Sequence, residues 1–237
     1  MNRSKIAPFY RFLMVIVLSV TAWLPATGKP VAAEVPMDPI PSPILDPDSV
    51  SWASVRNMKS DQYADYFDEK SRAGMMVMDI EVDEIDGEQR VGATWQMNMD
   101  KRSWIQLRNM DEAEFTAEQA EQREAGFRMI DQEVYTLGSQ KYYAAVWIYN
   151  TEGLGWISYT DKSSEEFNTL FGRYSEAGYL MIDIDAGLIQ GAMNYSAVWV
   201  DNSESLAWVE LRDMTSEEFA DKFDELDDVY RMIDVES

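Results

Sequence analysis

The fold is decided by one unit of sequence, Trp104 to Asn150, which reads WIQLRNMDEAEFTAEQAEQREAGFRMIDQEVYTLGSQKYYAAVWIYN. Its first tryptophan recurs every 52 residues, and three other positions of the unit recur at the same interval. These series are Trp52, Trp104, Trp156 and Trp208; Trp95, Trp147 and Trp199; Asn98, Asn150 and Asn202; and Gly74, Gly126 and Gly178. A fixed period of this kind is typical of one supersecondary unit copied in tandem, in which each copy buries its apolar face against the next.

Each unit begins with a strand and continues with a helix. Residues 104–110 alternate apolar and polar side chains, which predicts a half-buried strand. The helix start is marked by a short acceptor followed three residues later by a carboxylate, in the pairs Asp111 with Glu114, Ser163 with Glu166, and Thr215 with Glu218. The helix is expected to end at the recurrent glycine, where a left-handed residue is easiest for glycine.

Two more strands complete the unit. FRMIDQEVY follows the glycine at residue 127, and YAAVW covers Tyr143 to Trp147. These two strands and the first strand of the next unit are expected to form an antiparallel meander, with the helix crossing back to begin the next one. The sequence therefore predicts an α+β fold, a curved or partly closed tandem array of three-stranded antiparallel meanders, each joined by one helix, with about 52 residues per repeat.

The N-terminal region differs from the repeats in composition. Basic residues, an apolar run from Phe12 to Leu24 and small residues up to Ala33 predict a secretory signal peptide over residues 1–33. The apolar run is too short to span a bilayer as a helix, so no stable membrane anchor is expected after cleavage. Residues 34–50 are rich in proline and predict an extended linker. The predicted repeat domain covers residues 51–237, as repeats 52–103, 104–155 and 156–207 and a half repeat 208–237.

Charge and cysteine content narrow the class of protein. The chain has 43 acidic and 20 basic residues, a net charge of −23, and no cysteine. Nucleic acid would be repelled, because affinity for phosphates comes from Lys and Arg. Anionic lipid surfaces are disfavoured for the same reason. An exported chain without disulfides indicates a bacterial protein of the periplasm or the extracellular space that depends on packing for stability.

The sequence provides no recognisable catalytic site. Without histidine or cysteine, a Ser/His/Asp or Cys/His arrangement and a His-ligated zinc site are impossible. No phosphate-binding glycine loop occurs. A pair of carboxylates could still perform acid and base chemistry, although such pairs arise by chance in so acidic a chain. We therefore expect no enzyme activity and no cofactor.

Aspartates in the second strand of each unit are the most unusual feature, since Asp is depleted inside strands. The first strands carry arginines at a matching register, so the arginines and the aspartates are candidate structural ion pairs. As an alternative, the carboxylates could accept hydrogen bonds from backbone N–H groups. Calcium coordination by the same carboxylates is a further alternative. The residues concerned are Asp79, Asp131, Asp183, Asp234, Arg56, Arg108 and Arg212.

The seven recurrent tryptophans have two interpretations. They could form a repeated core, or they could stack on a sugar or a peptide along a concave surface. Their position in alternating strands beside Ala and Val favours the core, with Trp52, Trp95, Trp104, Trp147, Trp156, Trp199 and Trp208 as its candidate members. The half repeat leaves strand edges unpaired, so the two ends are expected to close on each other or to accept a strand from a second chain, which would make a homo-oligomer.

The motif order resembles the bacterial tandem repeat domain 1 family, whose repeats also precede the catalytic domain of secreted polyglycine hydrolases. The resemblance covers residues 52–237 and rests on the Trp strand, the capped EEF helix, the RMID strand and the YAAVW strand. It implies an α+β repeat array without an activity that transfers residue by residue. We expect an exported non-enzymatic module that binds a protein or peptide. The alternatives are a secreted hydrolase or hydrolase accessory acting on peptide or glycan, and a calcium-stabilised structural protein.

Overall fold

The computed structural model describes residues 12–18, 51–189, 191–226 and 230–236. The predicted linker and most of the predicted signal peptide lie outside these residues. The first two units are β2 (Trp52–Lys59), α1 (Ser60–Arg72), β3 (Met75–Ile85) and β4 (Glu88–Met97), then β5 (Trp104–Met110), α2 (Glu112–Glu124), β6 (Phe127–Leu137) and β7 (Gln140–Tyr149). The third is β8 (Trp156–Lys162), α3 (Ser164–Glu176), β9 (Tyr179–Ile189) and β10 (Ala192–Asp201), and the fourth is β11 (Ala207–Met214), α4 (Ser216–Leu226) and β12 (Arg231–Glu236).

The predicted fold class is confirmed, with one correction to the strand pairing. Each of the first three units forms a three-stranded antiparallel sheet with one helix, and the fourth unit contributes two strands and one helix to a fourth three-stranded sheet. The third strand, however, pairs with the first strand of its own unit, in the orders β2-β4-β3, β5-β7-β6 and β8-β10-β9. The expected pairing with the following first strand is wrong, because the connection after the third strand carries the chain to the next sheet.

The local signals at the helix ends are confirmed. Asp111 accepts hydrogen bonds from the backbone of Ala113 and Glu114, while Glu114 accepts one from the Asp111 N–H at 2.9 Å. Equivalent capping boxes begin α3 and include Thr215 with Glu218 before α4. These bonds satisfy N–H groups that a helix leaves unpaired in its first turn. Gly126 adopts a φ of 87° directly after α2, a conformation that costs a residue with a Cβ atom energy.

The recurrent asparagines hold the turn between consecutive units. Asn150 accepts a hydrogen bond from the Leu154 N–H at 3.1 Å and donates one to the Leu154 carbonyl at 2.9 Å. Asn98 and Asn202 make the same pair of bonds within their turns. Each turn therefore has its own hydrogen-bonding clamp, which fixes the start of the next first strand.

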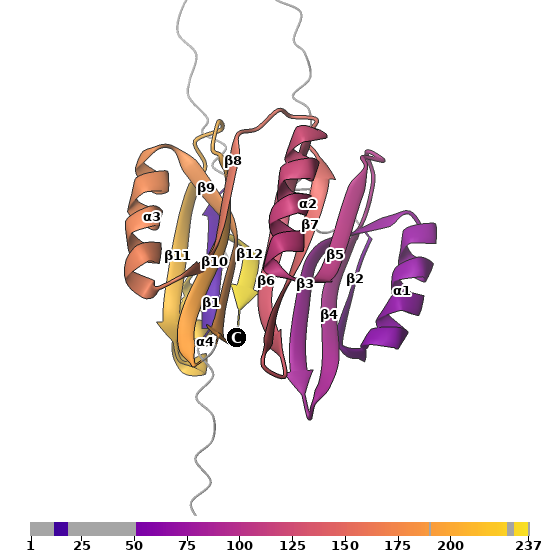
Figure 1. Ribbon diagram of the computed structural model, residues 1–237. Coiled ribbons are helices and arrows are strands. Elements are labelled where there is room, and N and C mark those ends of the chain that lie inside the picture. The colour runs from indigo at the N-terminus through magenta and orange to yellow at the C-terminus, as the bar shows by residue number, and fades with distance from the viewer. Residues whose placement is uncertain (1–11, 19–50, 190, 227–229, 237) are drawn as a thin grey trace, which may run out of the picture.

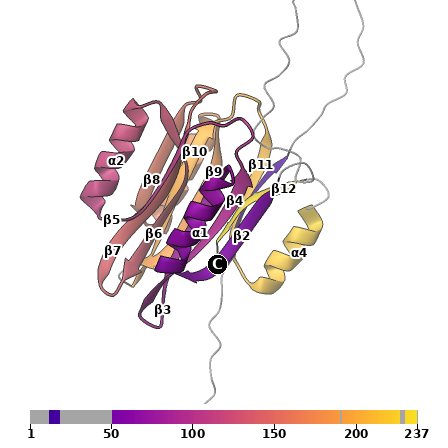
Figure 2. The same cartoon turned by 90° about the vertical axis from the view of Figure 1, so that its right-hand side faces the viewer.

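The second strands lie next to one another from unit to unit. β3 contacts β6, β6 contacts β9, and β9 contacts β12. The helices lie outside: α1 and α3 are at opposite sides in Figure 1, and α2 and α4 are at opposite sides in Figure 2. The array is therefore curved, with its second strands inside and its helices around the periphery, and the sheets do not join into one closed sheet.

The tryptophans of the third strands lie at the centre of the core of the first three units. Trp95, Trp147 and Trp199 are completely buried. In the first unit, the Trp95 ring lies 5.3 Å from Phe67 of α1, and in the third the Trp199 ring lies 5.7 Å from Phe171 of α3. Burial of an indole on this scale is among the largest contributions that a single side chain makes to stability.

Candidate functional site

The fourth sheet obtains its central strand from a distant part of the sequence. β1 (Phe12–Leu18) lies between β11 and β12 and is antiparallel to both. This is the position that the third strand occupies in the other three sheets. The apolar core of the predicted signal peptide thus fills the place of the third strand of the fourth unit.

The register of β1 reproduces that of a true third strand. In the third sheet, Trp199 pairs with Ile157 on the first strand and with Met181 on the second. In the fourth sheet, Ile16 pairs with Val209 and Met232, which are the equivalent positions. Both sheets also have an irregularity at the same place, next to the aspartate of the second strand. Ile16 therefore stands at the register that tryptophan holds in the other three sheets.

The helix of the fourth unit is less deeply packed than the others. Among the described residues, α4 has no buried side chain, whereas α1, α2 and α3 bury Tyr63, Phe115 and Phe167 respectively. Phe223, the equivalent of Phe67 and Phe171, is 38% exposed. The fourth unit accordingly has an incompletely covered aromatic side chain on its helix.

Carboxylates of the second strands accept hydrogen bonds from backbone N–H groups of the second strand of the preceding unit. Asp183 accepts a hydrogen bond from the Gln132 N–H at 3.3 Å, and Asp185 accepts one from the Val134 N–H at 3.0 Å. Asp234 does the same for the Ile184 N–H at 2.8 Å. A second strand lies at the edge of its sheet, where N–H groups have no strand partner, and these carboxylates take the place of that partner.

Burial makes these carboxyl groups weaker acids than carboxyl groups in water. Burial raises the pKa of Asp79, and burial together with nearby carboxylates raises the pKa of Asp131 and Asp183 well above the usual range. Burial also raises the pKa of Asp185 to about 7, opposed by its hydrogen bonds, and that of Asp234 to about 7. Removing a carboxylate from water disfavours its charged form, and like charges nearby add to the effect.

The predicted Arg-to-Asp ion pairs do not form among the described residues. Arg108 donates to the Ser60 hydroxyl at 2.9 Å, and Arg212 donates to Asn168 at 2.6 Å and pairs with Glu210. Arg56 forms no ion pair with Asp79 within the described residues, and its charge only partly opposes the rise in the pKa of that carboxyl that burial causes. The physical reason is the strand order, because the third strand separates the arginines of the first strand from the aspartates of the second. Arg108 and Arg212 instead join the second and fourth units to the helix of the unit before them.

The structure places the tryptophans of the first strands between units. Trp104 lies 5.5 Å from Phe67, and Trp208 lies 5.5 Å from Phe171, each against the preceding unit. Trp156 is buried, and the Arg123 guanidinium lies 3.6 Å from its ring centroid. Trp52 is a correction to the predicted core, because its side chain is 68% exposed. Within the described residues, Trp52 has no counterpart of the phenylalanine that contacts Trp104 and Trp208 from the preceding unit.

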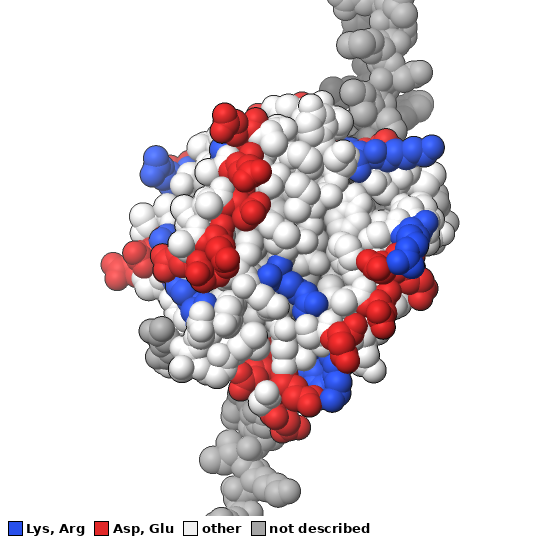
Figure 3. Space-filling view, turned by 45° about the vertical axis from the view of Figure 1, so that its right-hand side comes forward, with Lys and Arg blue, Asp and Glu red and all other residues white. Residues whose placement is uncertain are grey.

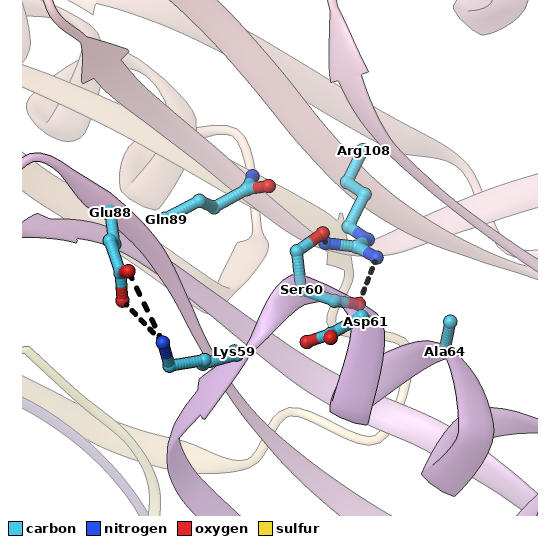
Figure 4. A pocket seen from close by; sticks show the side chains of 7 residues that line it. All are labelled: Lys59, Ser60, Asp61, Ala64, Glu88, Gln89 and Arg108. Atoms are coloured by element: carbon cyan, nitrogen blue, oxygen red, sulfur yellow. Dashed lines mark hydrogen bonds and ion pairs between the residues drawn. The ribbon is translucent and has the colours of Figure 1, made fainter.

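A shallow groove lies between the first two units. Figure 4 shows Lys59, Ser60, Asp61, Ala64, Glu88, Gln89 and Arg108 around it. Several of its polar groups are already engaged: Lys59 forms an ion pair with Glu88 at 2.9 Å, and Arg108 donates a hydrogen bond to the Ser60 hydroxyl. Groups that already neutralise each other present little net charge to a ligand, so the groove lacks the convergent free groups of a catalytic centre.

The described part of the chain has neither a metal-binding cluster nor a membrane-spanning helix. No group of three or more acidic side chains has an arrangement that could hold a metal ion. No helix there is long and apolar enough to cross a membrane.

Sequence reasoning missed the strand role of Phe12–Leu18. The seven residues are apolar without interruption, and apolar and β-branched side chains suit a strand buried in a sheet. That signal was present, but the same run also matches the core of a signal peptide. Only the pairing with β11 and β12 shows the second role.

The repeat geometry matches a known family of repeats. The sequence model of the polyglycine hydrolase-like structural repeat matches residues 49–98, 101–150, 153–202 and 205–237. The chain belongs to this family. The four matched segments of the polyglycine hydrolase-like repeat correspond to the four units described above, which confirms the resemblance drawn from the motifs. No curated protein shows a significant match to the chain.

Proposed function

We propose that this protein is an exported, non-enzymatic repeat module that acts by binding an extended protein or peptide segment. The observation that supports the proposal is the fourth sheet, in which β1 is held between β11 and β12 although it is remote from both in sequence. Recognition by strand addition uses this geometry, since main-chain hydrogen bonds supply affinity and side-chain pockets supply specificity. The exported location is proposed from the predicted signal peptide and linker.

The surface charge is compatible with a protein or peptide partner. Figure 3 shows acidic side chains in two bands, with a largely uncharged strip between them that holds a few basic groups. Together with the net charge of −23, such a surface disfavours polyanions and favours neutral or basic segments. An extended apolar segment fits the fourth sheet without opposing this charge.

A display experiment tests the binding function. Short random peptides would be selected against the full chain carrying Ile16→Pro, in which proline removes an N–H group and disrupts β1. We expect enrichment of extended apolar sequences over the unmodified chain, where β1 occupies the sheet. The variant Ala32→Pro, whose substitution lies outside β1, serves as the matched control. Equal recovery from all three proteins would contradict the proposal.

An accessory role beside a hydrolase is the second candidate. It is favoured by the family description, which names polyglycine hydrolases. Purified protein would be incubated with oligoglycine peptides and with glycans, alone and with a hydrolase of this type. An accessory protein raises the turnover of the hydrolase but does not hydrolyse the substrate by itself. Hydrolysis by the protein alone would establish an enzyme and overturn the non-enzymatic assignment.

A further inference from the structure

We infer that the fourth sheet is a strand-acceptor site specific for an extended peptide that places an indole at the register of Ile16. The inference rests on the proposed function, because it specifies the ligand of the same site. The ligand is a largely apolar strand with tryptophan between valines or similar side chains, as in β10, which reads AMNYSAVWVD.

The first support is the agreement of register. In the other three sheets, the central strand has a tryptophan at this register. Trp95 pairs with Ala53 on the first strand and Val77 on the second. Trp147 pairs with Ile105 and Met129 in the same way. The fourth sheet has the same pairing geometry, with Val209 and Met232 opposite Ile16. A strand of the β10 type thus enters the site at a defined register, because a slip of one residue turns every side chain to the opposite face.

The second support is the aromatic partner that the central tryptophan has in the third unit. Phe171 lies against both Trp199 and Trp208, at 5.7 Å and 5.5 Å between ring centroids. Its equivalent in the fourth unit is Phe223, which is stacked on Phe219 and remains 38% exposed. In the third sheet, the phenylalanine of this helix position contacts the tryptophan of the central strand, so an indole at the register of Ile16 would bring the same two ring types to the fourth unit. Aromatic pairs add stabilisation beyond the area that they bury.

Peptide binding to the full chain tests the inference. The full chain with Ile16→Pro would be titrated with labelled peptide NYSAVWVDN, residues 194–202 of this sequence, and with the same peptide carrying Trp199→Ala. We expect the tryptophan peptide to bind at least about tenfold more tightly, as is typical for removal of an aromatic anchor. Equal affinity of the two peptides overturns the indole preference while leaving strand addition in place. Absence of binding by both peptides, with the variant folded by circular dichroism, overturns the proposed function as well.

Disulfide trapping tests the register independently, because the chain has no cysteine of its own. Ala197 pairs with Tyr159 in the third sheet, and the equivalent of Tyr159 in the fourth sheet is Leu211. A peptide with Ala197→Cys is therefore expected to cross-link to the chain carrying Leu211→Cys together with Ile16→Pro. The control peptide with Val198→Cys presents its thiol to the opposite face and should not cross-link. Equal trapping of both peptides contradicts the register.

A substitution within the intact chain covers the case in which Ile16→Pro does not fold. Ile16→Trp places an indole on β1 itself. We expect it to raise the melting temperature of the full chain, whereas Ile16→Ala lowers it. A lower melting temperature for Ile16→Trp than for the unmodified chain would show that the site rejects an indole and would overturn the inference.

Discussion

At the residue scale, the same side chain has a different role according to its neighbours. The tryptophans of the third strands are completely buried, and Trp95 and Trp199 also pack against the first-strand tryptophan of the next unit, while the tryptophans of the first strands depend on the unit before them. Trp147 is 0% exposed, and Trp52 is 68% exposed. Recurrence in sequence identified both series, but burial follows from the position of each unit in the array.

Truncation of these two tryptophans should have very different effects. Trp147→Ala creates a large cavity and is expected to lower the free energy of unfolding by about 3–5 kcal/mol. Trp52→Ala removes an exposed ring and should change it by no more than about 0.5 kcal/mol. Urea denaturation followed by circular dichroism measures both values. A loss at Trp52 as large as that at Trp147 would show that Trp52 is buried in solution.

The buried carboxyls make stability depend on pH in a direction opposite to that of most surface carboxylates. Since the pKa of Asp185 is raised to about 7 in the fold, the folded state holds a proton that the unfolded state releases near its ordinary, lower pKa. Stability is therefore greatest below that ordinary value, and falls as the pH rises toward about 7. One such group contributes a slope of up to about 1.4 kcal/mol per pH unit.

Asp185→Asn should reduce this slope between about pH 5 and pH 7. The amide oxygen can still accept the hydrogen bond from Val134, whose N–H lies 3.0 Å from the carboxylate. Urea denaturation across the pH range, with exposed Asp86→Asn as the control, measures the change. An unchanged slope in Asp185→Asn would mean that this carboxyl does not titrate with folding.

At the scale of elements, each helix and turn carries its own terminating hydrogen bonds. The capping boxes begin α2 and α3, and the asparagine clamps close the connections between units. These bonds join residues three or four positions apart. Because they are local, the sequence motifs that encode them predict them well.

Removal of one cap tests this local control. Asp111→Ala is expected to lower the free energy of unfolding by about 1 kcal/mol, because two N–H groups of the first turn of α2 lose their acceptor. Glu112→Ala, one position later and without a capping bond, is the matched control and should cost less. Similar losses in both variants would indicate that the first-turn charge, and not the capping oxygen, stabilises the helix start.

At the scale of the whole molecule, the curved array brings the second strands together and places their aspartates inside. Carboxylates of one unit accept hydrogen bonds from the backbone of the unit before it, and arginines of the first strands reach the preceding helix. The units are therefore held together by polar contacts as well as by aromatic packing. This differs from the predicted ion pairs, which would have lain within each unit.

A calcium-stabilised structural protein is the remaining alternative at this scale. We expect the melting temperature to be the same with calcium and with a chelator, since the acidic side chains of the described region have no metal-binding arrangement. Differential scanning calorimetry measures it, with magnesium as the control for a general ionic effect. Bound calcium would raise the melting temperature in proportion to the logarithm of its concentration, and such a rise would restore this alternative.

The sequence by itself determined the repeat length, the order of elements and the ends of the helices, because these depend on periodicity and on hydrogen bonds between near neighbours. It also identified Trp95, Trp147 and Trp199 as core. Only the tertiary structure decided that the third strand pairs with the first strand of its own unit, that Arg108 and Arg212 contact the preceding helices, and that Phe12–Leu18 fills the fourth sheet. Those outcomes depend on which distant strands become neighbours, and a strand pattern specifies the faces of a strand without specifying its partner.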